Sequence, residues 1–228
     1  MSSTFLLMPR DPILARDARP FAADPGAQAR SLPWLLPSTT AGAIRTYLGG
    51  SWHEGDAHRK AEELLRVAVH GPLLAVREDS GEWTTYYRAP ADAVVHKPEG
   101  GGARIMTLRP FHPSQGAGCD LPEGLLPLKV TEDVKPVSGY TYWPQEAITQ
   151  YLSGKGTTEP SPKCLGDLPR ESRVHVSIDP KTKTSKSGML FATSSLVFAD
   201  GFVSSGRSGE LRLFAADRAA GEDGEPRA

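Results

Sequence analysis

Proline and glycine content is the sequence feature that most limits the folds open to this chain. Its 228 residues include 20 prolines and 23 glycines. Proline lacks a backbone N–H and glycine is conformationally permissive, so both interrupt long helices and central strands. The sequence therefore predicts short elements separated by long ordered loops. With 39% hydrophobic and 23% charged residues, it still predicts a globular, soluble protein with a real core, in one large or two small domains.

The cellular compartment and the redox state of the cysteines are predicted from patterns that the sequence does not contain. The sequence contains no apolar run long enough to span a membrane, and Phe5–Met8 is too short for the hydrophobic region of a signal peptide. Cys119 and Cys164 form no metal-type spacing, which indicates reduced cysteines. We therefore expect a cytoplasmic protein without a membrane partner.

The first forty-five residues carry the strongest local pattern. Thr4–Met8 is an apolar run that predicts a buried strand, and a proline ends it. Arg10, Arg16 and Arg19 then crowd a loop that further prolines stiffen. A helix is predicted next, with Ser38 as its N-cap.

This predicted helix has one apolar face and a clear end. Ala41, Ile44 and Leu48 recur at helical spacing, and Gly49-Gly50 form a C-terminal cap. The unpaired N–H groups at a helix N-terminus favour an anion. The loop arginines, with the hydroxyls of Ser38 and Thr39, therefore predict a phosphate site. The alternative is that these arginines are solvated surface charges paired with neighbouring aspartates.

The middle of the chain predicts further short elements. They are a helix from an Asp56 N-cap to His70, stopped by Gly71-Pro72; paired strands at Leu73–Val76 and Trp83–Tyr87; a loop at Pro90–Gly102; a strand at Ile105–Leu108; a long loop at Pro110–Leu128; a helix from Tyr142-Trp143-Pro144 to Leu152; and a last strand at Glu210–Ala215. In the helix ending at Leu152, the inward-facing residues are Ala147, Ile148, Tyr151 and Leu152. Trp143 is expected in the core or at a protein contact.

A hairpin is predicted between residues 173 and 198. Arg173–Asp179 alternates apolar and polar residues, Pro180–Gly188 forms a turn, and Met189–Phe198 returns as a strand. Three basic residues then lie on an exposed tip: Lys181, Lys183 and Lys186. The formal net charge of −1 does not indicate a nonspecific nucleic-acid binder, but a local basic cluster can bind RNA.

The residues show no pattern of an enzyme or a metalloprotein. The six histidines lie on different predicted elements without metal-ligand spacing. The sequence has no P-loop, no Rossmann fingerprint and no Gly-x-Ser-x-Gly motif. A metal-independent ribonuclease using one histidine with lysines stays open. We expect no cofactor and no metal.

Three sequence blocks resemble one known family. They are PRDPILARDARPF (9–21), SLPWLLPSTTAGAIRTYL (31–48) and RVHVSIDPKTKTSKSGMLF (173–191). In this order they resemble the third subunit of the type III-B CRISPR effector, the Cmr complex, a member of the RAMP superfamily. Family members are usually longer, so the C-terminal part after Phe214 is expected to be missing. The family's hairpin tip more often carries acidic residues where Ser185, Lys186 and Ser187 stand here.

The resemblance implies a fold and a domain division. The expected class is α/β (α+β), with a ferredoxin-like or RRM-like antiparallel sheet, packed helices and long Pro/Gly-rich loops. Residues 1–135 would form an N-terminal ferredoxin-like domain. Residues 136–220 would begin a second RAMP-like unit, and residues 221–228 would be an acidic tail.

The resemblance also implies a function. The chain would be a non-catalytic subunit that grips the 5′ handle of the guide RNA. It would dock the large polymerase- or cyclase-like signalling subunit and the first RAMP backbone subunit. The predicted RNA-binding residues are Arg10, Arg16, Arg19, Ser38, Thr39, Arg45, Lys181, Lys183 and Lys186. The alternatives are a RAMP-type endoribonuclease that processes guide precursors and a purely structural adaptor.

Overall fold

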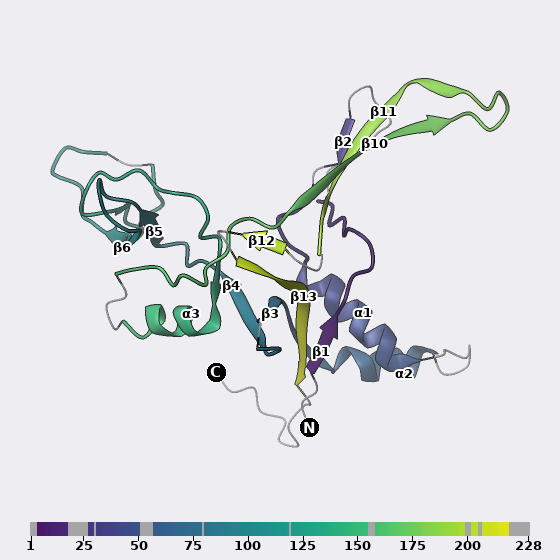
Figure 1. Cartoon of the computed structure of the whole chain (residues 1–228), viewed down its shortest axis with the longest axis horizontal. Coiled ribbons are helices and arrows are strands. Elements are labelled where there is room, and N and C mark those ends of the chain that lie inside the picture. Colours follow the sequence, from purple (N-terminus) through teal and green to yellow (C-terminus); the bar gives the residue numbers. More distant parts are fainter. Residues whose placement is uncertain are drawn as a thin grey trace. The chain divides into compact units, whose positions relative to one another are not determined.

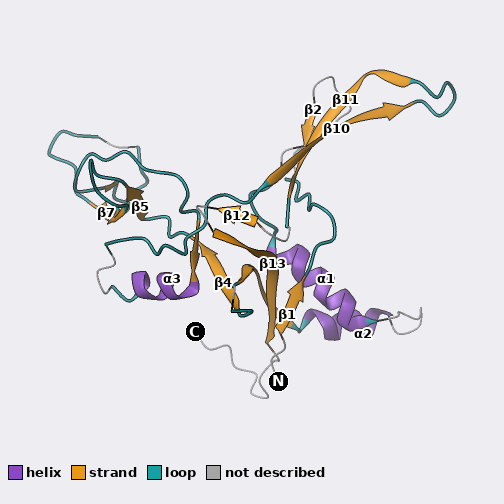
Figure 2. Cartoon of the chain, viewed as in Figure 1, coloured by secondary structure: helices purple, strands orange, loops and turns teal. Residues whose placement is uncertain are grey.

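The computed structural model describes residues 4–17, 27–29, 31–50, 57–78, 80–118, 120–154, 158–198, 202–204 and 207–218 (Figure 1). The elements are β1 (Thr4–Leu7), β2 (Ala27–Ala29), α1 (Pro37–Gly49), α2 (Ala57–Leu65), β3 (Ala68–Arg77), β4 (Trp83–Arg88), β5 (Ala93–His96), β6 (Arg104–Thr107), β7 (Arg109–Pro110), β8 (Leu128–Lys129), β9 (Tyr142–Pro144), α3 (Gln145–Leu152), β10 (Arg170–Ile178), β11 (Ser185–Leu196), β12 (Phe202–Ser204) and β13 (Arg207–Arg218). Few helices among mostly antiparallel strands confirm the α/β (α+β) class (Figure 2). The ferredoxin-like arrangement stays a prediction.

The chain forms two compact units, each assembled from separate stretches of sequence. Unit 1 comprises Met1–Trp83, Leu168–Phe202 and Gly209–Ala228, and unit 2 comprises Thr84–Asp167 and Val203–Ser208. The predicted domain boundary at residues 135 and 136 stays a prediction.

In the sheet of unit 1, the C-terminal strand β13 lies between β1 and β3. It is antiparallel to both, with Leu7 opposite Leu213 and Val76 opposite Leu211. The strand predicted at Glu210–Ala215 is confirmed and is longer. The strand predicted at Thr4–Met8 is also confirmed, one residue shorter, but the prediction that it is buried was wrong. Its residues alternate between exposed and half-buried, because β1 has only β13 as a sheet neighbour in the described part of the chain.

Strand β3 replaces part of a predicted helix. Helix α2 ends at Leu65 instead of His70, and its predicted N-cap Asp56 lies outside the described residues. Gly71-Pro72 lies inside β3, where Gly71 has a φ of 113° that favours glycine. The helical period from Ala57 onward was misleading beyond Leu65, because long-range pairing with β13 determines the conformation of residues 68–77.

Helix α1 packs against β3 and contributes the buried Ala41 and Ile44 to unit 1. The N-cap residue is Leu36, without a side-chain hydrogen bond, so the predicted Ser38 N-cap was wrong. Pro37 occupies the first helical position, where its fixed φ suits the helix and its missing N–H costs nothing. Leu48, predicted on the inner face, is 41% exposed. The predicted end is confirmed: Gly50 caps the helix and donates its N–H to the carbonyl of Tyr47.

Unit 2 is built around Trp143, which is 1% exposed. Its indole N–H donates to the Tyr140 carbonyl at 2.9 Å, and its ring meets Tyr151 edge-on at 5.5 Å between centroids. Cys164 is buried in the same cluster, where burial raises the pKa of its thiol to about 12. The predicted core position of Trp143 is therefore confirmed. Leu152, predicted to face inward on α3, is 72% exposed.

The loops of unit 2 hold more strand than predicted. Strand β5 (Ala93–His96) pairs with β6 (Arg104–Thr107), so Pro90–Gly102 was wrong as a pure loop. A four-residue strand is too short to show a clear period, which explains the error. The loop predicted at Pro110–Leu128 is confirmed, and the two-residue strands β7 and β8 close it.

The predicted hairpin is the two-stranded ribbon β10–β11 of unit 1 (Figure 1). Its register runs from Arg170 opposite Leu196 to Ile178 opposite Ser185, with an irregularity after Val176. Strand β2 pairs in parallel with β11. The turn is shorter than predicted, because β11 begins at Ser185. Strand β10 keeps the predicted alternation, yet its aliphatic residues lie exposed, with Val174 67% exposed.

Among the described residues, none of the helices has the length and apolar character needed to cross a membrane.

Candidate nucleic-acid interface

The arginine segment that follows β1 is held in place by backbone hydrogen bonds. Ile13 and Leu196 exchange two N–H···O bonds of 2.8 Å each. Leu32 donates its N–H to the Ala15 carbonyl at 2.6 Å, and Arg16 forms a bridge with Ser31. Backbone bonds therefore fix this segment to the end of β11 on one side and to the residues just before α1 on the other.

Two of the three predicted loop arginines lie in this segment. Arg10 and Arg16 are exposed, whereas Arg19 lies outside the described residues. Both side chains are attached to ordered backbone, so the positions of their Cα atoms are defined. An exposed guanidinium on such a frame can bind phosphate through two parallel hydrogen bonds.

The N-terminus of α1 offers less to an anion than the sequence predicts. Pro37 has no N–H, and the N–H groups of Thr39 and Thr40 both donate to the Leu36 carbonyl, at 3.1 and 3.4 Å. Ser38 is left as the N–H donor of the first turn. The side chains of Ser38 and Thr39 are exposed, and the first turn contains no acidic residue. The helix end can thus contribute one backbone donor and two hydroxyls.

Arg45 is engaged with the backbone of its own chain. Its Nε and Nη2 donate to the Val67 carbonyl at 3.2 and 2.8 Å in a part-buried position. This fork connects α1 to the turn before β3. Its placement gives Arg45 a role in the fold, whether or not RNA is bound.

The hairpin tip is ordered by an aspartate. The Asp179 carboxylate accepts N–H groups from Lys181 at 2.7 Å and Thr182 at 3.3 Å, and its carbonyl accepts the N–H of Lys183 at 2.8 Å. Lys183 has a φ of 57°, the left-handed conformation. Lys181, Lys183 and Lys186 are all exposed, with Lys186 at the start of β11. The tip therefore presents two ammonium groups on a hydrogen-bonded turn and a third at the start of β11.

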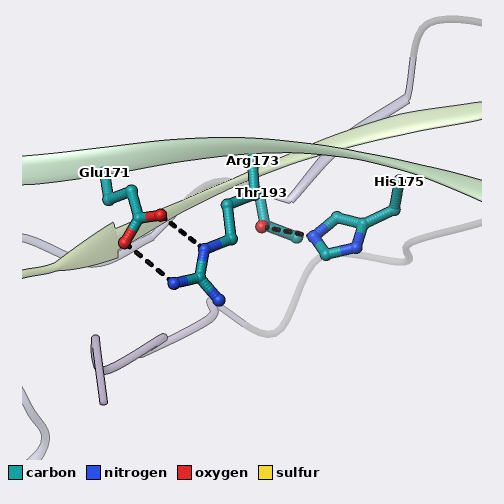
Figure 3. A network of polar contacts seen from close by, with 4 residues as sticks. All are labelled: Glu171, Arg173, His175 and Thr193. Carbon is teal, nitrogen blue, oxygen red and sulfur yellow. Dashed lines mark hydrogen bonds and ion pairs between the residues drawn. The ribbon is translucent and has the colours of Figure 1, made fainter.

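The two faces of the β10–β11 ribbon differ in chemistry. One face carries a polar network, which Figure 3 shows: Glu171 accepts two bonds from Arg173 at 2.6 and 3.0 Å, and His175 Nε2 lies 3.0 Å from the Thr193 hydroxyl. The Arg173 guanidinium lowers the pKa of the Glu171 carboxyl. On the same face the His175 ring stacks on Phe191 at 5.0 Å. The opposite face carries Val174, Val176 and Ile178.

A pocket at the base of this ribbon was not predicted. It has a volume of about 270 Å³, and its polar lining comes from Ser31, Arg170, Ser172, Thr193 and Ser194. Arg170 and Ser31 are far apart in sequence and belong to no shared motif. The pairing of β10 with β11 and of β2 with β11 brings these segments together.

The predicted site residues therefore lie in separate parts of unit 1. Arg10 and Arg16 lie on the loop after β1, Ser38 and Thr39 at the start of α1, and the three lysines at the ribbon tip. In the described part of the chain, histidine, cysteine and acidic side chains form no group of three that could hold a metal ion.

Comparison with known proteins identifies the family. No curated protein matches the sequence. Among solved structures, a chain of the cryo-EM structure of the Type III-B Cmr-beta bound to cognate target RNA and AMPPnP is similar at 14% identity, with a TM-score of 0.42. The similarity covers 94% of this chain and 53% of that chain, so this chain spans about half the length of its structural neighbour. The family model described as CRISPR-associated protein (Cas_Cmr3) matches residues 5–220, and the chain belongs to that family.

Proposed function

We propose that this chain is the Cmr3-type subunit of a type III-B CRISPR effector complex and binds the 5′ handle of the guide RNA without cleaving it. Membership of the Cas_Cmr3 family over residues 5–220 supports a place in such a complex. The observation that carries RNA binding is the set of exposed cationic side chains on ordered backbone in unit 1: Arg10, Arg16, Lys181, Lys183 and Lys186. Arg19 joins the proposed set from the sequence alone.

Phosphate binding is the chemistry that these residues share. Arg10 and Arg16 would each take a phosphate through the planar guanidinium fork. Ser38 and Thr39 would add hydroxyl contacts at the start of α1. The ammonium groups of the tip would act as point charges toward the backbone of the same RNA. Sequence reading of the target would then be left to base pairing between guide and target.

The same proposal includes two protein partners. These are the large polymerase- or cyclase-like signalling subunit and the first RAMP backbone subunit. Purifying the assembled complex with this chain tagged, and identifying the copurifying subunits, tests both. Recovery of neither would contradict the proposed place in the complex.

The salt dependence of RNA binding tests the arginine contacts directly. In the reconstituted complex, Arg10→Ala with Arg16→Ala should flatten the plot of log affinity against log salt by about 1.4, because each single-stranded phosphate contact contributes a slope of roughly 0.7. The matched control removes two exposed charges of unit 2, Arg88→Ala with Lys97→Ala, and should leave the slope unchanged.

Two outcomes would reject the proposal in favour of its rivals. An unchanged slope combined with failed assembly would identify these arginines as protein contacts of an adaptor. Specific cleavage of repeat RNA by the purified chain, abolished by a histidine substitution, would identify a ribonuclease.

A further inference from the structure

The pocket at the base of the ribbon has the chemistry of a ligand site. It opens beside β2, β10 and β11, and its volume of about 270 Å³ is near the lower limit of small-molecule pockets in proteins. Its lining contains one arginine, four hydroxyl residues and two alanines, Ala29 and Ala192, and no carboxylate. Such a lining favours an anionic or hydroxyl-bearing ligand over a cation.

Hydrogen-bonding capacity remains unused around the pocket. One Arg170 Nη2–H donates to the Leu32 carbonyl at 3.1 Å, and the guanidinium carries several further N–H donors. Ser172 and Ser194 lie directly opposite each other across β10 and β11, so both hydroxyls line the same side. The Ser31 hydroxyl is buried and has no hydrogen-bond partner in the described part of the chain. A buried polar atom without a partner is costly, and a ligand or an ordered water relieves that cost.

The pocket is continuous with the aliphatic face of the ribbon. Residues two apart in a strand share a face, so Ser172, Val174 and Val176 lie in one row on β10. On β11, Ala192 lies opposite Val174 and Leu190 opposite Val176. A polymer leaving the pocket along the ribbon would therefore pass apolar side chains before reaching the lysines of the tip. Single-stranded RNA combines a charged backbone and 2′-hydroxyls with apolar base faces, and its unstacked bases bind such surfaces.

We propose that this pocket holds one unstacked nucleotide of the single-stranded guide RNA, with Arg170 on its phosphate and the serine hydroxyls on its ribose and base edge. The proposal rests on the proposed function and assigns to it a site that none of the predicted arginines or lysines belongs to.

Two variants test the pocket without touching the bond between Arg170 and Leu32. Ala192→Leu fills the pocket with an aliphatic side chain. Ser172→Ala with Ser194→Ala removes two hydroxyls and adds no bulk, which keeps the test valid if Ala192→Leu fails to fold. Ala91→Leu, at an exposed turn of unit 2, is the matched control for added bulk.

The measurement is 2′-hydroxyl acylation of the guide RNA in the reconstituted complex. The wild-type complex should show a protected handle nucleotide whose reactivity rises about 5- to 10-fold in both pocket variants, which corresponds to about 1.0–1.4 kcal/mol. The control should reproduce the wild-type pattern. A wild-type pattern in both folded pocket variants would overturn the nucleotide pocket and leave the proposed function standing. A handle unprotected in the wild-type complex would overturn both.

Discussion

Arg45 shows at the scale of one residue why a sequence pattern does not reveal what a side chain binds. It lies in the same block as Ser38 and Thr39, so it was predicted to bind RNA. In the structure both of its donating nitrogens meet the carbonyl of Val67, twenty-two positions away. No local period encodes such a contact. A hydrogen bond to a charged group contributes about 1.5–3 kcal/mol, more than a typical neutral one.

Stability measurements on Arg45 variants test this structural role. Arg45→Ala should lower the free energy of unfolding by about 1.5–3 kcal/mol, because the Val67 carbonyl loses a charged donor in a part-buried position. Urea unfolding of the purified chain provides the value. Arg66→Ala, an exposed arginine after α2, is the control and should change stability by less than about 0.5 kcal/mol. If the Arg45 variant kept its stability and the complex bound RNA more weakly, Arg45 would be assigned to RNA binding instead of to the fold.

At the scale of elements, prediction succeeded where the signal was local. The alternation of Arg173–Asp179 and the cap at Gly49-Gly50 depend on near neighbours, and both are confirmed. Strand β3 depends on β13, more than a hundred residues later, so a helix was extended into it wrongly. The exposure of Val174 could not be predicted either. Alternation shows which side chains share a face of the strand, but not whether another part of the protein covers that face.

The ribbon tip carries an element-scale prediction. Replacing Lys181, Lys183 and Lys186 together with alanine should leave the melting temperature nearly unaltered, because all three side chains are exposed and the turn is held by Asp179. Assembly with RNA-loaded partners should weaken, most clearly at low salt where exposed charges are least screened. The control removes three exposed charges of unit 2, Arg88, Lys97 and Lys135. If low-salt assembly is the same for both variants, the tip has no electrostatic role.

At the scale of the whole molecule, charge is balanced. The chain carries 26 basic and 27 acidic residues, for a formal net charge of −1. The basic residues that we assign to RNA lie on separate segments of unit 1: the loop after β1, the start of β10 and the ribbon tip. Composition therefore could not predict an RNA-binding surface. That prediction came from the three sequence blocks that resemble the family.

This balance predicts weak binding by the isolated chain. Without its partners, the chain should bind handle RNA poorly at moderate salt, because a near-neutral protein exerts little long-range attraction on a polyanion. Fluorescence anisotropy with labelled handle RNA, compared with the assembled complex, measures the difference. Tight binding by the chain alone that survives moderate salt would show that its own surface is sufficient.

The position of β13 between β1 and β3 matters for how the protein is made. Thr4–Leu7 is synthesised long before its sheet partner Leu213–Ala216. At typical rates of about 5–20 residues per second, roughly 200 intervening residues take about 10–40 s to synthesise. Until β13 is made, β1 has no sheet neighbour among the described strands, and one edge of β3 is unpaired. This sheet therefore forms only after synthesis has passed β13, and a chain truncated before Arg207 would lack the strand that pairs with β1.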